Sequence, residues 1–150
     1  MARDWMADLL TQTEARRANA RLQAHMHQVA TEKTGEMLAK LRERMKSDIE
    51  RYAAGTGHSL TFTAQEEQSF EVRGDEFPAV FIRLEAGSAA IKVRTSVKKS
   101  ATANERFSDL TIEIIAKAQD NLYYRIKGDD FRDVGDVSET LLSPLLSRLD

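Results

Sequence analysis

The three histidines are the first candidates for acid–base chemistry or metal binding. His25 and His27 are two residues apart in a segment rich in helix-forming residues, so they point to different sides of a helix. His58 lies alone at the start of a region with strand-like alternation. Because a catalytic or metal site needs groups that converge, we expect surface or capping roles for all three.

A run of aspartates between residues 128 and 136 is the second candidate. Asp129, Asp130, Asp133 and Asp136 could supply oxygen ligands to a hard cation. Their order differs from that of an EF-hand loop, which needs acids at its first, third and fifth positions. We interpret the segment as a solvated turn before a helix, where carboxylates favour the positive end of the helix dipole. The sequence therefore predicts no metal site.

The common signatures of cofactor binding and nucleophilic catalysis are missing. The sequence contains neither GxGxxG nor GxxxxGK[ST], and it lacks the GxSxG elbow of serine hydrolases. It has no cysteine, which excludes thiol nucleophiles, thiolate metal sites and disulfides. We expect no cofactor and favour a non-enzymatic protein, although catalytic groups distant in sequence would leave no such signature.

The elements that must position any site fall into two parts. Residues 1–54 contain no proline and one glycine, and their composition predicts a long helical arm, with Thr34–Gly35 as the natural place for a break if the chain folds back. From residue 58 to 127 the apolar period changes to two, which predicts about six antiparallel strands with one buried face. A leucine-rich stripe from Leu141 to Leu149 predicts a closing helix. We expect one α+β domain, with the sheet and closing helix in 55–150.

The alternation also predicts which strand residues form the core and which face solvent. Six aliphatic positions should pack with Leu41 and Leu145, namely Ile82, Ile91, Val93, Ile112, Ile114 and Ile126. The opposite face is rich in cations and carries Phe81 and Tyr123. Seven of these cations are candidates for binding a polyanion: Arg73, Arg83, Lys92, Arg94, Lys98, Arg125 and Lys127. The competing and favoured interpretation is a solubilising face held by cross-strand ion pairs.

The helical arm is too long for the body that it must cover. A helix of this length runs about 80 Å, whereas a body of the remaining size is roughly 35 Å across. Four apolar residues at its start would then lie in water: Trp5, Met6, Leu9 and Leu10. We expect these residues to mediate self-association as a homodimer, to bind another protein, or to fold back in a hairpin at Gly35.

The composition and net charge limit the classes of partner that the protein is expected to bind. The formal net charge is −2, so no global field draws the chain to nucleic acid or membrane. No apolar run approaches the roughly 20 residues of a membrane span, and the absence of cysteine favours a cytoplasmic protein. The leading hypothesis is a non-enzymatic assembly module. The alternatives are a binder of polyanions or nucleic acid, and an enzyme or small-ligand carrier with a helix–sheet pocket near Thr95 and Tyr124.

Overall fold

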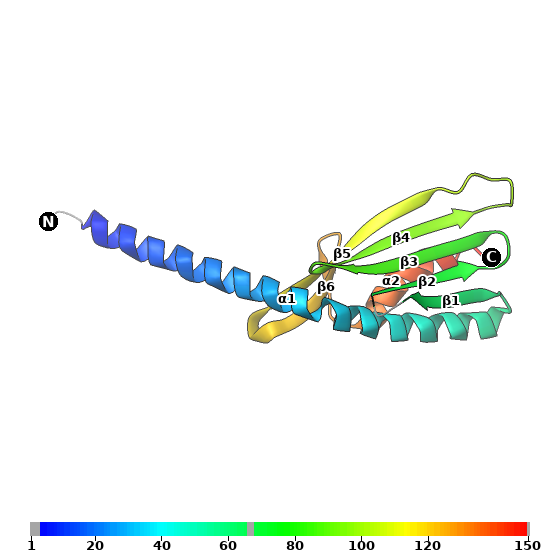
Figure 1. Cartoon of the computed structure of the whole chain (residues 1–150), viewed down its shortest axis with the longest axis horizontal. Coiled ribbons are helices and arrows are strands. Elements are labelled where there is room, and N and C mark those ends of the chain that lie inside the picture. Colours follow the sequence, from blue (N-terminus) through cyan, green and yellow to red (C-terminus); the bar gives the residue numbers. More distant parts are fainter. Residues whose placement is uncertain (1–3, 66–67, 150) are drawn as a thin grey trace.

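The computed structural model describes residues 4–65 and 68–149 and shows an α+β fold (Figure 1). A long helix, α1 (Trp5–Thr56), precedes the sheet, and α2 (Val134–Leu146) follows it. The strands are β1 (Leu60–Gln65), β2 (Ser69–Gly74), β3 (Ala79–Gly87), β4 (Ala90–Lys98), β5 (Phe107–Lys117), β6 (Asn121–Ile126) and β7 (Asp129–Phe131). Each strand pairs antiparallel with the next, so the sheet order is the chain order.

The sheet has seven strands where the sequence predicted about six. The additional strand is β7, whose three residues pair with β6 in the register Tyr124 to Phe131. Asp129 and Asp130 therefore belong to a strand, and our assignment of both to a solvated loop was wrong. Three residues are too few for alternation to be recognised in the sequence. A tight turn at Lys127 and Gly128, with φ of 51° and 87°, joins β6 to β7 and accounts for the loop-like composition of this segment.

Helix α1 is continuous, so the chain does not break at Thr34–Gly35, which the sequence marked as the natural place for a break. The hydroxyl of Thr34 donates to the carbonyl of Ala30 at 2.7 Å inside the helix, and no atom lies within 4 Å of where a Cβ on Gly35 would be. A glycine in a helix costs about 1 kcal/mol relative to alanine. Burial of Thr34, Met37 and Leu38 on either side holds the helix together at that point.

The core lies between one face of the sheet and the two helices. All eight residues that the alternation predicted for the core are buried there, including Ile112 at 0 % and Leu41 at 0 % exposure. Two hydrogen bonds join the helices: Ser138 donates to Asp48 at 2.6 Å, and the Tyr52 hydroxyl donates to the Leu146 carbonyl at 3.2 Å. The helices are thus fixed to each other as well as to the sheet.

The N-terminal part of α1 extends well beyond the sheet (Figure 1). The first buried residue of the helix is Ala30, and nothing between residues 4 and 29 is fully buried. The helix leaves the body near His25, whose Nε2 lies 3.3 Å from a carboxylate oxygen of Asp120 in the turn between β5 and β6. We call residues 4–29 the arm. Within the described residues, no helix combines the length and apolar character needed to cross a membrane.

Candidate functional site

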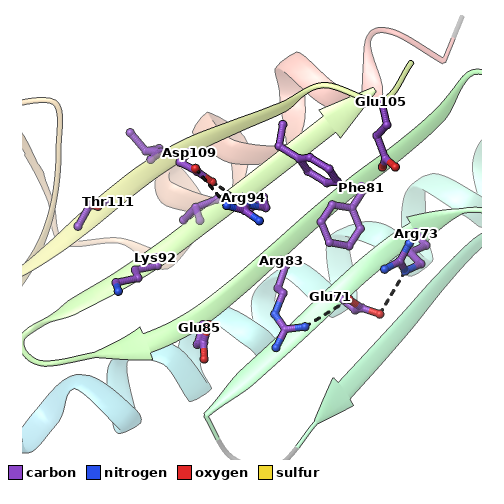
Figure 2. A pocket seen from close by; sticks show the side chains of 13 residues that line it. Glu71, Arg73, Phe81, Arg83, Glu85, Lys92, Arg94, Glu105, Asp109 and Thr111 are labelled. Atoms are coloured by element: carbon purple, nitrogen blue, oxygen red, sulfur yellow. Dashed lines mark hydrogen bonds and ion pairs between the residues drawn. The ribbon is translucent and has the colours of Figure 1, made fainter. Parts of the chain in front are cut away.

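Four of the seven cations proposed to bind a polyanion surround one hollow on the outer face of the sheet (Figure 2). This outer-face hollow measures about 670 Å³ and is lined by Arg73, Arg83, Lys92 and Arg94. The register explains their convergence, because Arg83 of β3 lies directly opposite Arg94 of β4. Glu71 of β2 lies opposite Arg83, and Asp109 of β5 lies opposite Arg94. The strands thus carry an acid–base–base–acid row.

The carboxylates of this row neutralise the arginines. Arg94 donates two hydrogen bonds to Asp109, at 2.8 and 3.3 Å, and this contact holds the pKa of the Asp109 carboxyl below its usual value. Arg73 donates to Glu71 at 3.2 Å. Glu85 and Glu105 also line the hollow, so its acids and cations balance. Of its four cations, Lys92 alone makes no ion pair within the described part of the chain.

Aromatic rings close the floor of the outer-face hollow. Phe81 is only 8 % exposed, because the guanidinium of Arg73 lies 4.5 Å from its ring centroid and Phe107 packs edge-on at 6.1 Å. Arg94 covers Phe107 in the same way, at 5.3 Å. Phe81, one of the two aromatic residues predicted on this face, is therefore already covered by the protein's own side chains.

The other three predicted cations lie apart from the hollow. Lys98 ends β4, and Lys127 occupies the turn before β7. Arg125 donates to Asp130 at 2.6 Å, and the Nζ of Lys117 lies 2.6 Å from the same carboxylate. These two contacts hold the pKa of Asp130 far below its usual value. This part of the outer face is organised by ion pairs, as the competing interpretation expected.

The remaining titratable candidates do not converge. His58 stacks on Tyr52 with ring centroids 6.0 Å apart, and His25 lies beside Asp120. The described residues hold no group of three or more histidine or carboxylate side chains placed to bind a metal ion. The hydroxyl of Tyr124 donates to the carbonyl of Met37 at 2.6 Å, and burial raises its pKa. Tyr124 is therefore a structural residue of the core.

The start of the arm exposes four large apolar side chains, which we call the tip cluster. Trp5 is 65 % exposed, Met6 46 %, Leu9 46 % and Leu10 57 %. The fold-back hairpin that would have covered them is wrong, since α1 runs straight through Gly35. Leu22, further along the arm, is also 49 % exposed. The arm thus presents apolar groups to solvent at two levels along its length.

Residues 4–27 of the arm form two halves of equal length that carry opposite charge. Residues 4–15 contain Asp4, Asp8 and Glu14 and no cation, whereas residues 16–27 contain Arg16, Arg17 and Arg21 and no acid. None of these arginines makes an ion pair within the described residues. The net charge of the whole chain hides this division, because the three acids and the three arginines cancel. A window of about a dozen residues would have shown it.

Comparison of the chain with models of protein families, with curated proteins and with solved structures found no match.

Proposed function

We propose that the protein is an assembly module that forms a homodimer by antiparallel pairing of two arms. The observation that carries this proposal is the division of residues 4–27 of the arm into an acidic and a basic half of equal length. A two-fold axis near Ala15 and Arg16 places each acidic half beside the partner's basic half. Symmetric pairs with a two-fold axis are the commonest homo-oligomers.

The same arrangement covers the exposed apolar groups. With the axis between residues 15 and 16, Trp5 of one chain lies level with Met26 of the other, and Leu9 lies level with Leu22. Each half of the arm is about 18 Å long at 1.5 Å per residue, so both contacts form together. Ala15 and Ala18 near the axis carry small side chains, which allow the two helices to approach closely.

Other pairings of the arms use these features less well. A parallel pair aligns acid with acid and arginine with arginine, and like charges on facing helices repel. A contact between the two tip clusters alone buries the apolar residues but leaves the basic half without a partner. Antiparallel pairing covers the apolar residues and brings the acidic and basic stretches of the two arms to the same level along the helical rod.

In such a dimer the two sheets sit at opposite ends of a helical rod. The two bodies would be held apart, because most of the arm extends beyond the sheet (Figure 1). The module would hold two identical surfaces at a fixed separation. That geometry suits a spacer or scaffold that presents two copies of one binding surface.

Exchange of charge between two variants tests the proposal. The triple variant Arg16→Glu, Arg17→Glu, Arg21→Glu makes the whole arm acidic, and Asp8→Arg with Glu14→Arg makes it basic beyond Asp4. Asp4 is kept because its side chain caps α1 by accepting from the Ala7 N–H at 3.1 Å. In sedimentation equilibrium at low salt, we expect a dimer for the native chain and at least tenfold weaker association for each variant alone, about 1.4 kcal/mol.

Mixing the two variants should restore a dimer of mixed composition, which native mass spectrometry resolves by mass. The matched control is Lys40→Glu with Arg132→Glu, a charge change on exposed residues of the body, and it should associate as the native chain does. A monomeric native chain, or variants that associate as well alone as when mixed, would refute the proposal. Circular dichroism must show unchanged helix content in every variant.

A further inference from the structure

A second hollow, which we call the end pocket, lies where the inner face of the sheet extends past the end of α2. It measures about 750 Å³ and is formed by β4, β5, the segment between them and the C-terminal end of α2. Thr95 and Ser108 contribute from paired positions on adjacent strands, while Pro144 and Leu145 contribute from α2. Thr95 is one of the two polar residues that suggested a helix–sheet pocket from the sequence.

The charged side chains around the end pocket all carry the same sign. Lys99, Arg106 and Arg148 line it, and no aspartate or glutamate does. None of these three cations makes an ion pair within the described part of the chain. The outer-face hollow has an acid for every cation, so a basic composition is not a general property of hollows on this protein.

Lys99 and Arg106 lie at the two ends of the connection between β4 and β5, and the fold brings Arg148 to them from the end of the chain that follows α2. Like charges held around one hollow repel one another, and the repulsion is relieved when an anion binds among them. The C-terminal end of the α2 dipole is negative and opposes an anion there. Three full positive charges outweigh this partial charge.

The rest of the lining fits an organic ligand with a charged head. The hydroxyl group of Ser108 and the side-chain amide of Asn104 can donate to oxygen atoms, whereas the Thr95 hydroxyl donates to the Ser108 carbonyl at 3.5 Å. Val97, Pro144 and Leu145 form an apolar wall. Sites for small molecules typically enclose about 300–1,000 Å³, with mostly apolar walls and a few polar groups that fix orientation.

We propose that the end pocket binds a small phosphate ester, with its phosphate held by Arg106, Arg148 and Lys99 and its organic part against the apolar wall. A phosphate dianion matches three cations better than a single carboxylate does. The planar guanidinium groups can each donate two parallel hydrogen bonds to phosphate oxygens. This site is independent of the arm and of dimer formation.

Titration with defined probes tests this site. Phenyl phosphate, inorganic phosphate and benzoate are each titrated into the full chain by calorimetry and by amide chemical-shift mapping. We expect phenyl phosphate to bind more tightly than either other probe, since only it has both the phosphate and the apolar part. Its shifts should map to residues 95–108 and 144–148. If benzoate bound more tightly than phenyl phosphate, the end pocket would prefer a carboxylate to a phosphate ester. That result would overturn the proposal.

Charge-neutral variants locate the site. The double variant Arg106→Gln, Arg148→Gln should weaken phenyl phosphate binding at least tenfold. The control Arg132→Gln removes one exposed arginine outside the pocket and should leave affinity within twofold of the native value. A weak site with a dissociation constant of about 1 mM would be mostly occupied at about 10 mM phenyl phosphate. The absence of binding at that concentration would overturn the proposal. Equal loss in the control, or shifts centred on the outer-face hollow, would overturn it as well.

Discussion

The hydroxyl of Tyr124 on β6 donates a 2.6 Å hydrogen bond to the main-chain carbonyl of Met37 on α1. The tyrosine is 1 % exposed, so this bond joins helix and sheet inside the core across 87 positions of sequence. Ala30 and Thr34, which are buried in the two turns before Met37, continue the contact to the point where the arm begins. The Tyr124 bond therefore helps to fix the direction in which the arm projects.

Removal of this hydroxyl should cost measurable stability. Tyr124→Phe keeps the ring and loses one hydrogen bond, which contributes about 0.5–1.5 kcal/mol to the free energy of unfolding. Urea titration at pH 7 measures the difference. Tyr123→Phe is the matched control, because Tyr123 lies on the outer face and its substitution should change little. A Tyr124→Phe variant as stable as the native chain would show that the bond contributes nothing.

The same tyrosine gives the native chain a specific dependence on alkaline pH. Burial raises the pKa of the Tyr124 hydroxyl above its usual value of 10.0, so the folded state favours the neutral form. The stability that Tyr124 contributes is complete below pH 10 and is lost as pH rises, since the unfolded chain then releases the proton more readily. The Tyr124→Phe variant should not show this part of the decrease in stability at high pH. Parallel pH profiles of the two proteins would contradict the assignment.

Truncation of a buried and of a partly buried isoleucine should lower the free energy of unfolding by different amounts. Ile112 is 0 % exposed and packs between the sheet and the helices, so Ile112→Ala should lower the free energy of unfolding by about 2–5 kcal/mol. Ile115 on the same strand is only partly buried, and Ile115→Ala should cost clearly less. Denaturant titration compares the two. A loss below about 0.5 kcal/mol for Ile112→Ala would place that residue outside the core.

Binding of a polyanion to the outer-face hollow stays a prediction. If phosphates bind there, affinity for DNA or heparin should fall steeply with salt, and Lys92→Glu with Arg94→Glu should abolish it. The ion pair between Arg94 and Asp109 argues for weak binding, because the anion must displace a carboxylate held by two hydrogen bonds. No mobility shift at low salt in the native chain would remove this hypothesis.

Periodicity predicted the fold well because each element repeats its signal many times. Alternation over β3, β4 and β5 placed Ile82, Ile91 and Ile112 in the core, since a slip by one residue would bury charge. It failed where the signal is short or depends on tertiary contacts. Three residues of β7 cannot show a period, and Gly35 remains helical because its buried neighbours hold it.

The surfaces were harder to predict than the core. Alternation placed Arg83 and Arg94 on the outer face but could not show that Glu71 and Asp109 lie opposite them, because strand register is not contained in one strand's pattern. The end pocket unites Lys99, Arg106 and Arg148 only after α2 has packed on the sheet. The division of charge on the arm, by contrast, is present in the sequence itself and needed only a shorter window.

The distance between two spin labels tests antiparallel pairing of the arms most directly. The chain has no cysteine, so Ala24→Cys introduces a single attachment site at an exposed position of the arm. With the axis between residues 15 and 16, the two labels in a dimer lie about 25 Å apart along the helix axis, at 1.5 Å per residue. A parallel pair would bring them to about 10 Å, and contact between tip clusters alone would separate them by about 50 Å. A double electron–electron resonance distance near 25 Å is the predicted result. A distance near 10 or 50 Å, or no dipolar coupling at a concentration where the chain is expected to be dimeric, would contradict the account.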